Sequence, residues 1–100
     1  MVNQIVNNVS PETIETLVIL QEECAEVIVE ISKIFRFGPD QMMKGSTETN
    51  MQRLEKELGD MLAMLKLLTE QEVGITMEGL EKGAENKLEK LKQYSNIRIK

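Results

Sequence analysis

The chain has 100 residues, of which 41% are hydrophobic, 3% are aromatic and 29% are charged, with a net charge of −5. This length fits one domain with a small, aliphatic core. The acidic balance argues against nucleic acids and anionic membranes as partners, because both need clustered lysine and arginine. Because the sequence contains no histidine, it excludes Ser-His and Cys-His nucleophile pairs and the usual zinc sites, and carboxylates remain as the main chemical groups.

The location of the protein is constrained by two further absences. No apolar run reaches the roughly 18 residues of a membrane span, and the amino terminus lacks the basic-then-apolar pattern of a signal peptide. The single cysteine, Cys24, cannot form an intramolecular disulfide, which suits a reducing compartment. We therefore expect a cytoplasmic protein, and we expect Cys24 to serve as a packing residue.

Glycine and proline divide the first half of the chain. Apolar residues at helical spacing in residues 1–9 predict a short amphipathic helix. Ser10 followed by Pro11 predicts the start of a long helix, because serine caps a helix and proline suits its first position. That helix is expected to continue to Phe37, and residues 38–50, which are rich in turn-forming residues, are expected to form a loop.

The second half of the chain predicts two more helices. One is expected from about Asn50 to Glu72, where Gly74 ends it, and the other from Thr76 through Tyr94. No segment predicts a strand. We therefore predict an all-α fold with a single domain over residues 1–100, in which 1–10 and 95–100 are peripheral. The apolar face of the second helix is expected to consist of Leu54, Leu58, Met61, Leu62, Leu65 and Leu68.

The first long helix combines a broad apolar surface with a row of acids. Projection at about 100° per residue places its main apolar face at Leu17, Cys24, Ala25, Ile28, Ile31 and Phe35. Glu22, Glu23, Glu26 and Glu30 lie on the opposite arc, which also carries Ile19 and Ile34. A charge row is usually a solvated face, but a helix that is apolar nearly all round is normally buried. Buried carboxylates without partners favour a bound cation.

The second long helix carries a matching acidic pair, Glu57 and Asp60, one turn apart. One interpretation is two ordinary surface ion pairs, Arg53–Glu57 and Lys56–Asp60, each four residues apart. The other is that both helices turn carboxylates toward a shared seam. Oxygen ligands of this kind suit Mg²⁺, and Mn²⁺ is also possible.

The two acidic halves resemble a known family. Glu22-Glu23-Cys24-Ala25-Glu26 followed by Glu57-Leu58-Gly59-Asp60 is similar to the E-E-x-x-E … E-x-x-D pattern of the MazG-like all-α nucleoside triphosphate pyrophosphohydrolases. Dimeric dUTPases and phosphoribosyl-ATP pyrophosphohydrolases are their relatives. The similarity covers roughly residues 14–94.

The resemblance implies a role for each matching residue. Glu23, Glu26, Glu57 and Asp60 would hold Mg²⁺, and Glu22 would orient or deprotonate the attacking water. Lys87 would contact the substrate phosphates, with Asn86 beside it. Lys33 is a further phosphate-binding candidate from the residues themselves, although it also fits an ordinary cation at a helix carboxyl terminus. An exposed helix lysine is the alternative interpretation of Lys87.

These observations predict Mg²⁺-dependent hydrolysis of a nucleoside triphosphate to its monophosphate and pyrophosphate. The broad apolar surface of the first helix predicts a homodimer or homotetramer, because two other helices of a short chain cannot cover it. Three alternatives stay open at this point: a dUTP or phosphoribosyl-ATP hydrolase with the same acidic cage, a non-catalytic helical interaction protein, and a structural bundle with an incidental acidic stripe.

Overall fold

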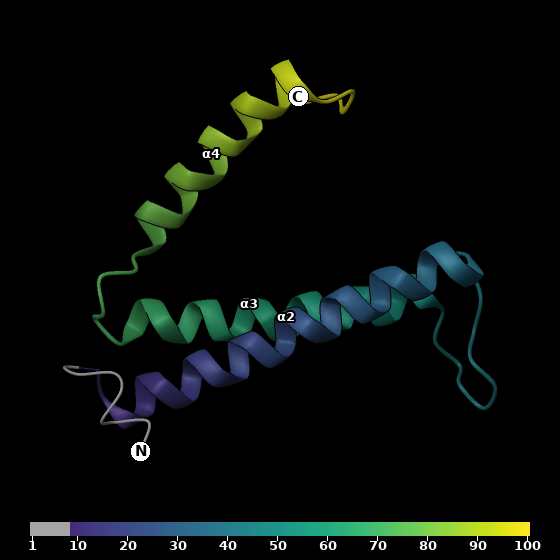
Figure 1. Ribbon diagram of the computed structural model, residues 1–100, viewed down its shortest axis with the longest axis horizontal. Helices are drawn as coiled ribbons and strands as arrows, with labels where there is room; N and C mark the ends of the chain where they lie inside the picture. Colours follow the sequence, from purple (N-terminus) through teal and green to yellow (C-terminus); the bar gives the residue numbers. More distant parts are fainter. Residues whose placement is uncertain (1–8) are drawn as a thin grey trace.

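The computed structural model describes residues 9–100, which form three helices and no strand (Figure 1). They are α2 (Pro11–Phe37), α3 (Asn50–Glu70) and α4 (Met77–Tyr94). The predicted all-α class is therefore confirmed. The helix expected in residues 1–9 lies outside the described residues, apart from Val9. No described helix combines the length and apolar character needed to cross a membrane.

The helices begin where the sequence places their caps. The Ser10 hydroxyl accepts a hydrogen bond from the Thr13 N–H at 3.1 Å, and Thr76 accepts one from Gly79 N–H at 3.0 Å. Thr49 and Gln52 form a reciprocal capping box at the start of α3. At the end of α2, Gly38 adopts φ +93°, a conformation that glycine reaches without a Cβ clash.

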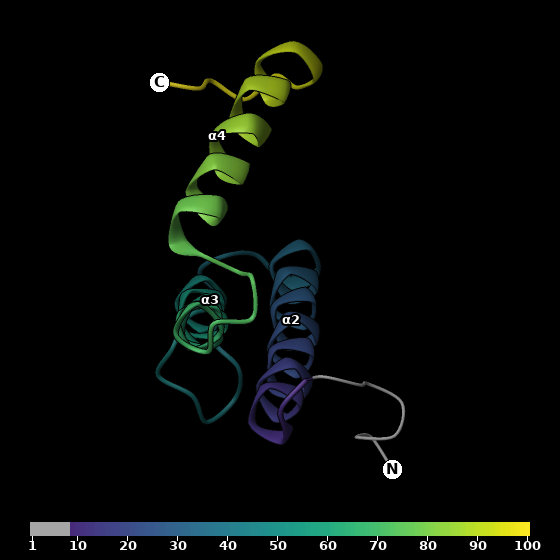
Figure 2. The same ribbon diagram turned by 90° about the vertical axis from the view of Figure 1, so that its left-hand side faces the viewer.

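Helices α2 and α3 run antiparallel and form a hairpin, as Figures 1 and 2 show. The connecting loop is fixed at its base, because the buried Asn50 donates from Nδ2 to the Gly38 carbonyl at 3.0 Å. The Met51 N–H also donates to the Pro39 carbonyl at 3.0 Å. The end of α2 is thereby tied to the start of α3.

The seam between α2 and α3 contains polar layers at seven-residue intervals. Thr16 and Glu30 are buried on α2, and Glu23 is half-buried between them. Gln71 donates to the Thr16 hydroxyl at 2.8 Å. The buried apolar side chains that accompany these layers are few: Val27, Met64 and Leu68.

The predicted main apolar face of the first helix is wrong for this chain taken alone. The side of α2 that contacts α3 is the arc containing Glu23 and Glu30, because Val27 and Ile34 on that arc supply the apolar contacts of a seven-residue repeat. The predicted face remains exposed. Its larger members have exposed fractions of 42% for Leu17, 68% for Ile28, 38% for Ile31 and 85% for Phe35.

Each helix carries one row of residues on either side of the seam. Because the helices are antiparallel, each row of α2 shares a side of the hairpin with one row of α3. On α3, Leu58 and Leu62 are exposed at 41% and 48%, and helical projection places them on the same side as Ile28 and Phe35. We call this the apolar side, defined by Leu17, Ile28, Ile31, Phe35, Leu58 and Leu62. Asp60 and Arg53 project to the other side, which we call the polar side.

Helix α4 projects away from the hairpin and buries none of its side chains within the described part of the chain (Figures 1 and 2). Its apolar stripe includes Leu88, which is 44% exposed. The predicted stripe of this helix is thus present without a partner in the described residues.

Leu68 provides a test of the hairpin packing. Leu68 is 1% exposed at the seam, whereas its neighbour Leu67 is 42% exposed on the polar side. We expect Leu68→Ala to lower the free energy of unfolding by about 2–5 kcal/mol, because it leaves a cavity. Urea denaturation measures the change. Leu67→Ala is the matched control, and an equal loss in both variants would contradict the assigned seam.

Candidate metal centre

Three carboxylates meet at the middle of the hairpin. Glu23 comes from α2, and Glu57 and Asp60 come from α3. One oxygen of each lies within 4.8 Å of one oxygen of each of the others. Glu57 and Asp60 share a side of α3 because they are three residues apart, and the seven-residue repeat of α2 turns Glu23 toward them. We call these three residues the acidic cluster.

The acidic cluster is an unfavourable arrangement for negative charge. Desolvation by burial raises the pKa of Glu57 above its ordinary value of 4.5, and the charges of Asp60, Glu23 and Glu26 raise it further. A side-chain hydrogen bond with Glu23 also favours the protonated form of Glu57. A cation bound among these oxygens would remove that repulsion, and carboxylate oxygens are the ligands that hard divalent cations prefer.

The two other predicted acids of α2 lie outside the acidic cluster. Glu26 is exposed, although its charge acts on Glu57. Glu22 is also exposed. Both project to the polar side of the hairpin. Their two exposed carboxylates therefore lie beside the acidic cluster on that side.

Two cations of the hairpin are paired with the same buried acid. Arg53 Nε lies 3.4 Å from Glu30 Oε1, and Lys33 Nζ lies 3.4 Å from Glu30 Oε2. The surface pairs Arg53–Glu57 and Lys56–Asp60 are absent from the ion pairs of the described residues. This finding removes the interpretation in which α3 neutralises its own acids.

Glu30 is the structural residue whose role the sequence did not reveal. It is 2% exposed, and its two oxygens hold one cation from each helix. A buried ion pair of this kind is costly to break, because it leaves an uncompensated charge. The seven-residue spacing of Glu30 from Glu23 indicates that both lie on the same face of α2. The pairing of Glu30 with Arg53 could not be predicted, because Arg53 is distant in sequence.

The predicted phosphate-binding residues are separated from one another. Lys33 is half-buried on α2, with Nζ 3.7 Å from Met43 Sδ. Lys87 and Asn86 are exposed on α4. None of the side chains of α4 is buried against the hairpin of the same chain. The expectation that Cys24 is packed is also wrong for one copy of the chain, since Cys24 is exposed, with Sγ 3.9 Å from Met61 Sδ.

Fold and site together define a class: an antiparallel all-α hairpin with a carboxylate cluster suited to a divalent cation. Residues 11–95 match the family described as the MazG nucleotide pyrophosphohydrolase domain. The chain therefore belongs to the MazG family, whose general activity is metal-dependent nucleotide pyrophosphohydrolysis. Comparisons with curated proteins and with solved structures give no match.

Stability against pH tests the repulsion in the acidic cluster. The folded protein binds the Glu57 proton more tightly than the unfolded chain, so ionisation of Glu57 opposes folding. This penalty is absent below the ordinary pKa of 4.5 and grows as pH rises through the raised pKa. In metal-free buffer we therefore expect Glu57→Gln to stabilise the protein at pH 7 and to have no such effect at pH 3.

Urea denaturation at the two pH values measures this difference. Glu70→Gln is the matched control, because Glu70 is exposed at the end of α3, about 20 Å along the helix from Glu57. Equal behaviour of the two variants at pH 7 would contradict the repulsion.

Proposed function

We propose that the chain is a Mg²⁺-dependent nucleoside triphosphate pyrophosphohydrolase, which converts a ribo- or deoxyribonucleoside triphosphate and water to the monophosphate and pyrophosphate. Mn²⁺ is the expected substitute ion. The observation that carries this proposal is the convergence of Glu23, Glu57 and Asp60 within 4.8 Å. Membership of the MazG family supports the reaction class.

The proposal assigns the acidic cluster and Glu26 as the residues that hold the ion. When bound, the ion would neutralise phosphate charge and lower the pKa of water. Glu26 is suited to be the fourth metal ligand, because it is exposed on the polar side beside the acidic cluster and its charge already acts on Glu57. Without a cation the same acids would repel the substrate phosphates.

Glu22 is the proposed general base. It is exposed and immediately precedes Glu23 on α2, so its carboxylate can accept a proton from a water on the polar side of the hairpin. Lys33, Lys87 and Asn86 are the proposed phosphate-binding residues, and a lysine ammonium would stabilise the leaving pyrophosphate electrostatically. Histidine is not required in this scheme, because carboxylates perform the proton transfer.

A second copy of the chain completes the proposed enzyme. The apolar side exposes side chains as large as Ile28 and Phe35, at 68% and 85%, and contiguous apolar surface of this kind marks an interface. Helix α4 lacks a partner in the described residues and is free to lie on the hairpin of another copy. The proposal assigns Lys87 and Asn86 to the acidic cluster of that second copy.

Metal binding tests the proposed centre. We expect Mg²⁺ or Mn²⁺ to raise the melting temperature of metal-free protein, with a gain of about 2.7 kcal/mol at 100 times the dissociation constant. Glu57→Gln should lose most of this gain and should reduce pyrophosphate release to background across a panel of canonical and damaged triphosphates. Scanning calorimetry and a pyrophosphate assay make the measurements.

The control for this test is Glu70→Gln, which should retain both the metal response and pyrophosphate release. If Glu57→Gln retained full activity, Glu57 would have no place in the metal centre.

Association tests the apolar side. We expect light scattering after size exclusion to give a dimer or tetramer for the natural chain and a monomer for Ile28→Glu, because a buried carboxylate without a partner opposes association. Leu67→Glu is the matched control, since Leu67 is 42% exposed on the polar side. A monomeric natural chain at high concentration would contradict the proposed assembly.

A further inference from the structure

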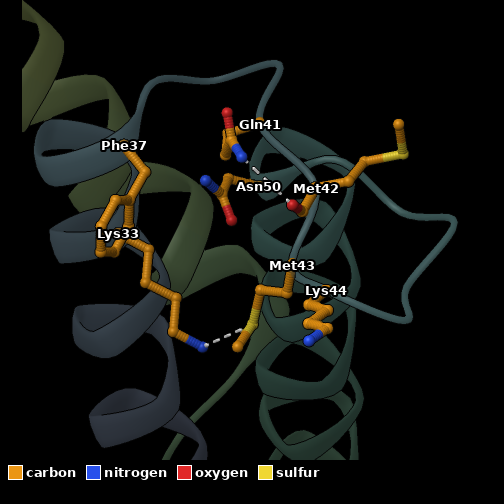
Figure 3. Close-up of a pocket in the computed structure, with 7 residues that line it drawn as sticks. All are labelled: Lys33, Phe37, Gln41, Met42, Met43, Lys44 and Asn50. Atoms are coloured by element: carbon orange, nitrogen blue, oxygen red, sulfur yellow. Dashed lines mark hydrogen bonds between the residues drawn. The ribbon is translucent and has the colours of Figure 1, made fainter.

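A pocket of about 240 Å³ lies where α2 passes into the loop, at one end of the hairpin (Figure 3). Phe37 and Lys33 of α2 form one wall, and Met43 and Lys44 of the loop form the other. Asn50, the first residue of α3, closes the base between them. The walls are mainly apolar, with a few polar groups at defined positions, as is typical of small-molecule sites.

The orientation of the Asn50 amide is fixed by the fold. Asn50 is 1% exposed, and its Nδ2 donates to the Gly38 carbonyl at 3.0 Å. The opposite atom, Oδ1, is buried and accepts no hydrogen bond. In Figure 3 this oxygen is turned into the space between the α2 side chains and Met43. A buried acceptor without a donor is rare in proteins, so the pocket is suited to a ligand that brings an N–H group.

The remaining groups favour a flat ring. Phe37 is 54% exposed, and Arg36 lies over its ring at 4.9 Å from the centroid, so only the other ring face can stack on a ligand. The Met43 thioether lies on the opposite wall. Lys33 Nζ is 3.7 Å from the Met43 sulfur, and Lys44 adds a second ammonium to the lining. Lys44 can donate to a ring carbonyl or ring nitrogen atom, whereas Lys33, which is paired with Glu30, is assigned to the phosphates. The complementary ligand is a planar heteroaromatic ring with both an N–H donor and acceptors.

The pocket and the acidic cluster are aligned on one side of the hairpin. Asn50 precedes Glu57 by seven residues of α3, which corresponds to about 10 Å along the helix axis. Lys33 and Asp60 both project to the polar side. A ligand with a ring in the pocket can therefore extend a charged chain toward the acidic cluster without crossing the hairpin.

We propose that this pocket binds the base of the nucleotide and that Asn50 Oδ1 selects bases through an N–H group. The proposal deepens the proposed function and rests on it for the identity of the substrate. Asn50 and the loop thus determine which base is accepted, while the acidic cluster holds the phosphates through the metal ion.

The first experiment uses nucleosides, which lack phosphate, and the complete chain in metal-free buffer. Adenosine, uridine, cytidine and guanosine are each compared by amide NMR titration with a partner methylated at the N–H group, such as N6,N6-dimethyladenosine or 3-methyluridine. We expect at least one natural nucleoside to shift the Asn50 side-chain amide and the amides of residues 41–44. Its methylated partner should bind roughly tenfold more weakly, because the buried acceptor is left unpaired. If none of the four natural nucleosides shifts these signals, the pocket assignment is overturned.

The second experiment uses exposed residues, so that folding is preserved. Met43 and Met51 are each 48% exposed, but Met51 does not line this pocket. Met43→Ala should weaken binding of the selected nucleoside several-fold, and Met51→Ala should not. Phe37→Ala should weaken it roughly tenfold, as expected for loss of a stacked base. Equal affinity in Met43→Ala and Met51→Ala would overturn the proposal.

The outcomes separate this proposal from the proposed function. Pyrophosphate release without any nucleoside response at Asn50 would overturn the base site and leave the enzyme. A nucleoside response at Asn50 without pyrophosphate release from any triphosphate would support the base site and overturn the proposed reaction.

Discussion

The packing of α2 on α3 through a partly polar seam is the constraint on which the rest of this structure depends. A hairpin of this size would ordinarily be held by apolar layers, yet Thr16, Glu23 and Glu30 occupy the seam at seven-residue intervals. Glu30 is neutralised by Arg53 and Lys33, whereas Glu23 faces two further carboxylates. One buried acid is thus paired with a cation from each helix, and the next acid along the seam contributes to an uncompensated negative site.

Local signals were sufficient to predict the three helices. Each helix begins at a capping side chain that accepts a hydrogen bond from a backbone N–H three residues further on: Ser10, Thr49 and Thr76. Both partners of each cap are close in the sequence, so the sequence alone indicates where the helix begins. The end of the second helix was predicted at Glu72 and lies at Glu70. The family resemblance implied four metal ligands, and three of them, Glu23, Glu57 and Asp60, lie together, whereas the fourth, Glu26, lies outside the cluster.

Tertiary choices were harder to predict. Helix α2 has two stripes that could contact α3, and residue spacing alone does not determine which of them does so. The ion pair between Arg53 and Glu30 joins residues distant in sequence. The Asn50 Oδ1 atom that accepts no hydrogen bond also owes its burial to such residues. Lys87 and Asn86 could not be placed for a similar reason, since α4 has no buried contact within the described residues of one chain.

The isolation of α4 has a consequence for how the polypeptide acquires its structure. Most of the stability of a helix in a protein comes from packing of its apolar face, and no described residue buries the apolar stripe of α4. In the proposed assembly, helix formation in this segment would be coupled to the association of two copies, so dilution would unwind α4. In that assembly the amount of ordered backbone would rise with the concentration of the chain.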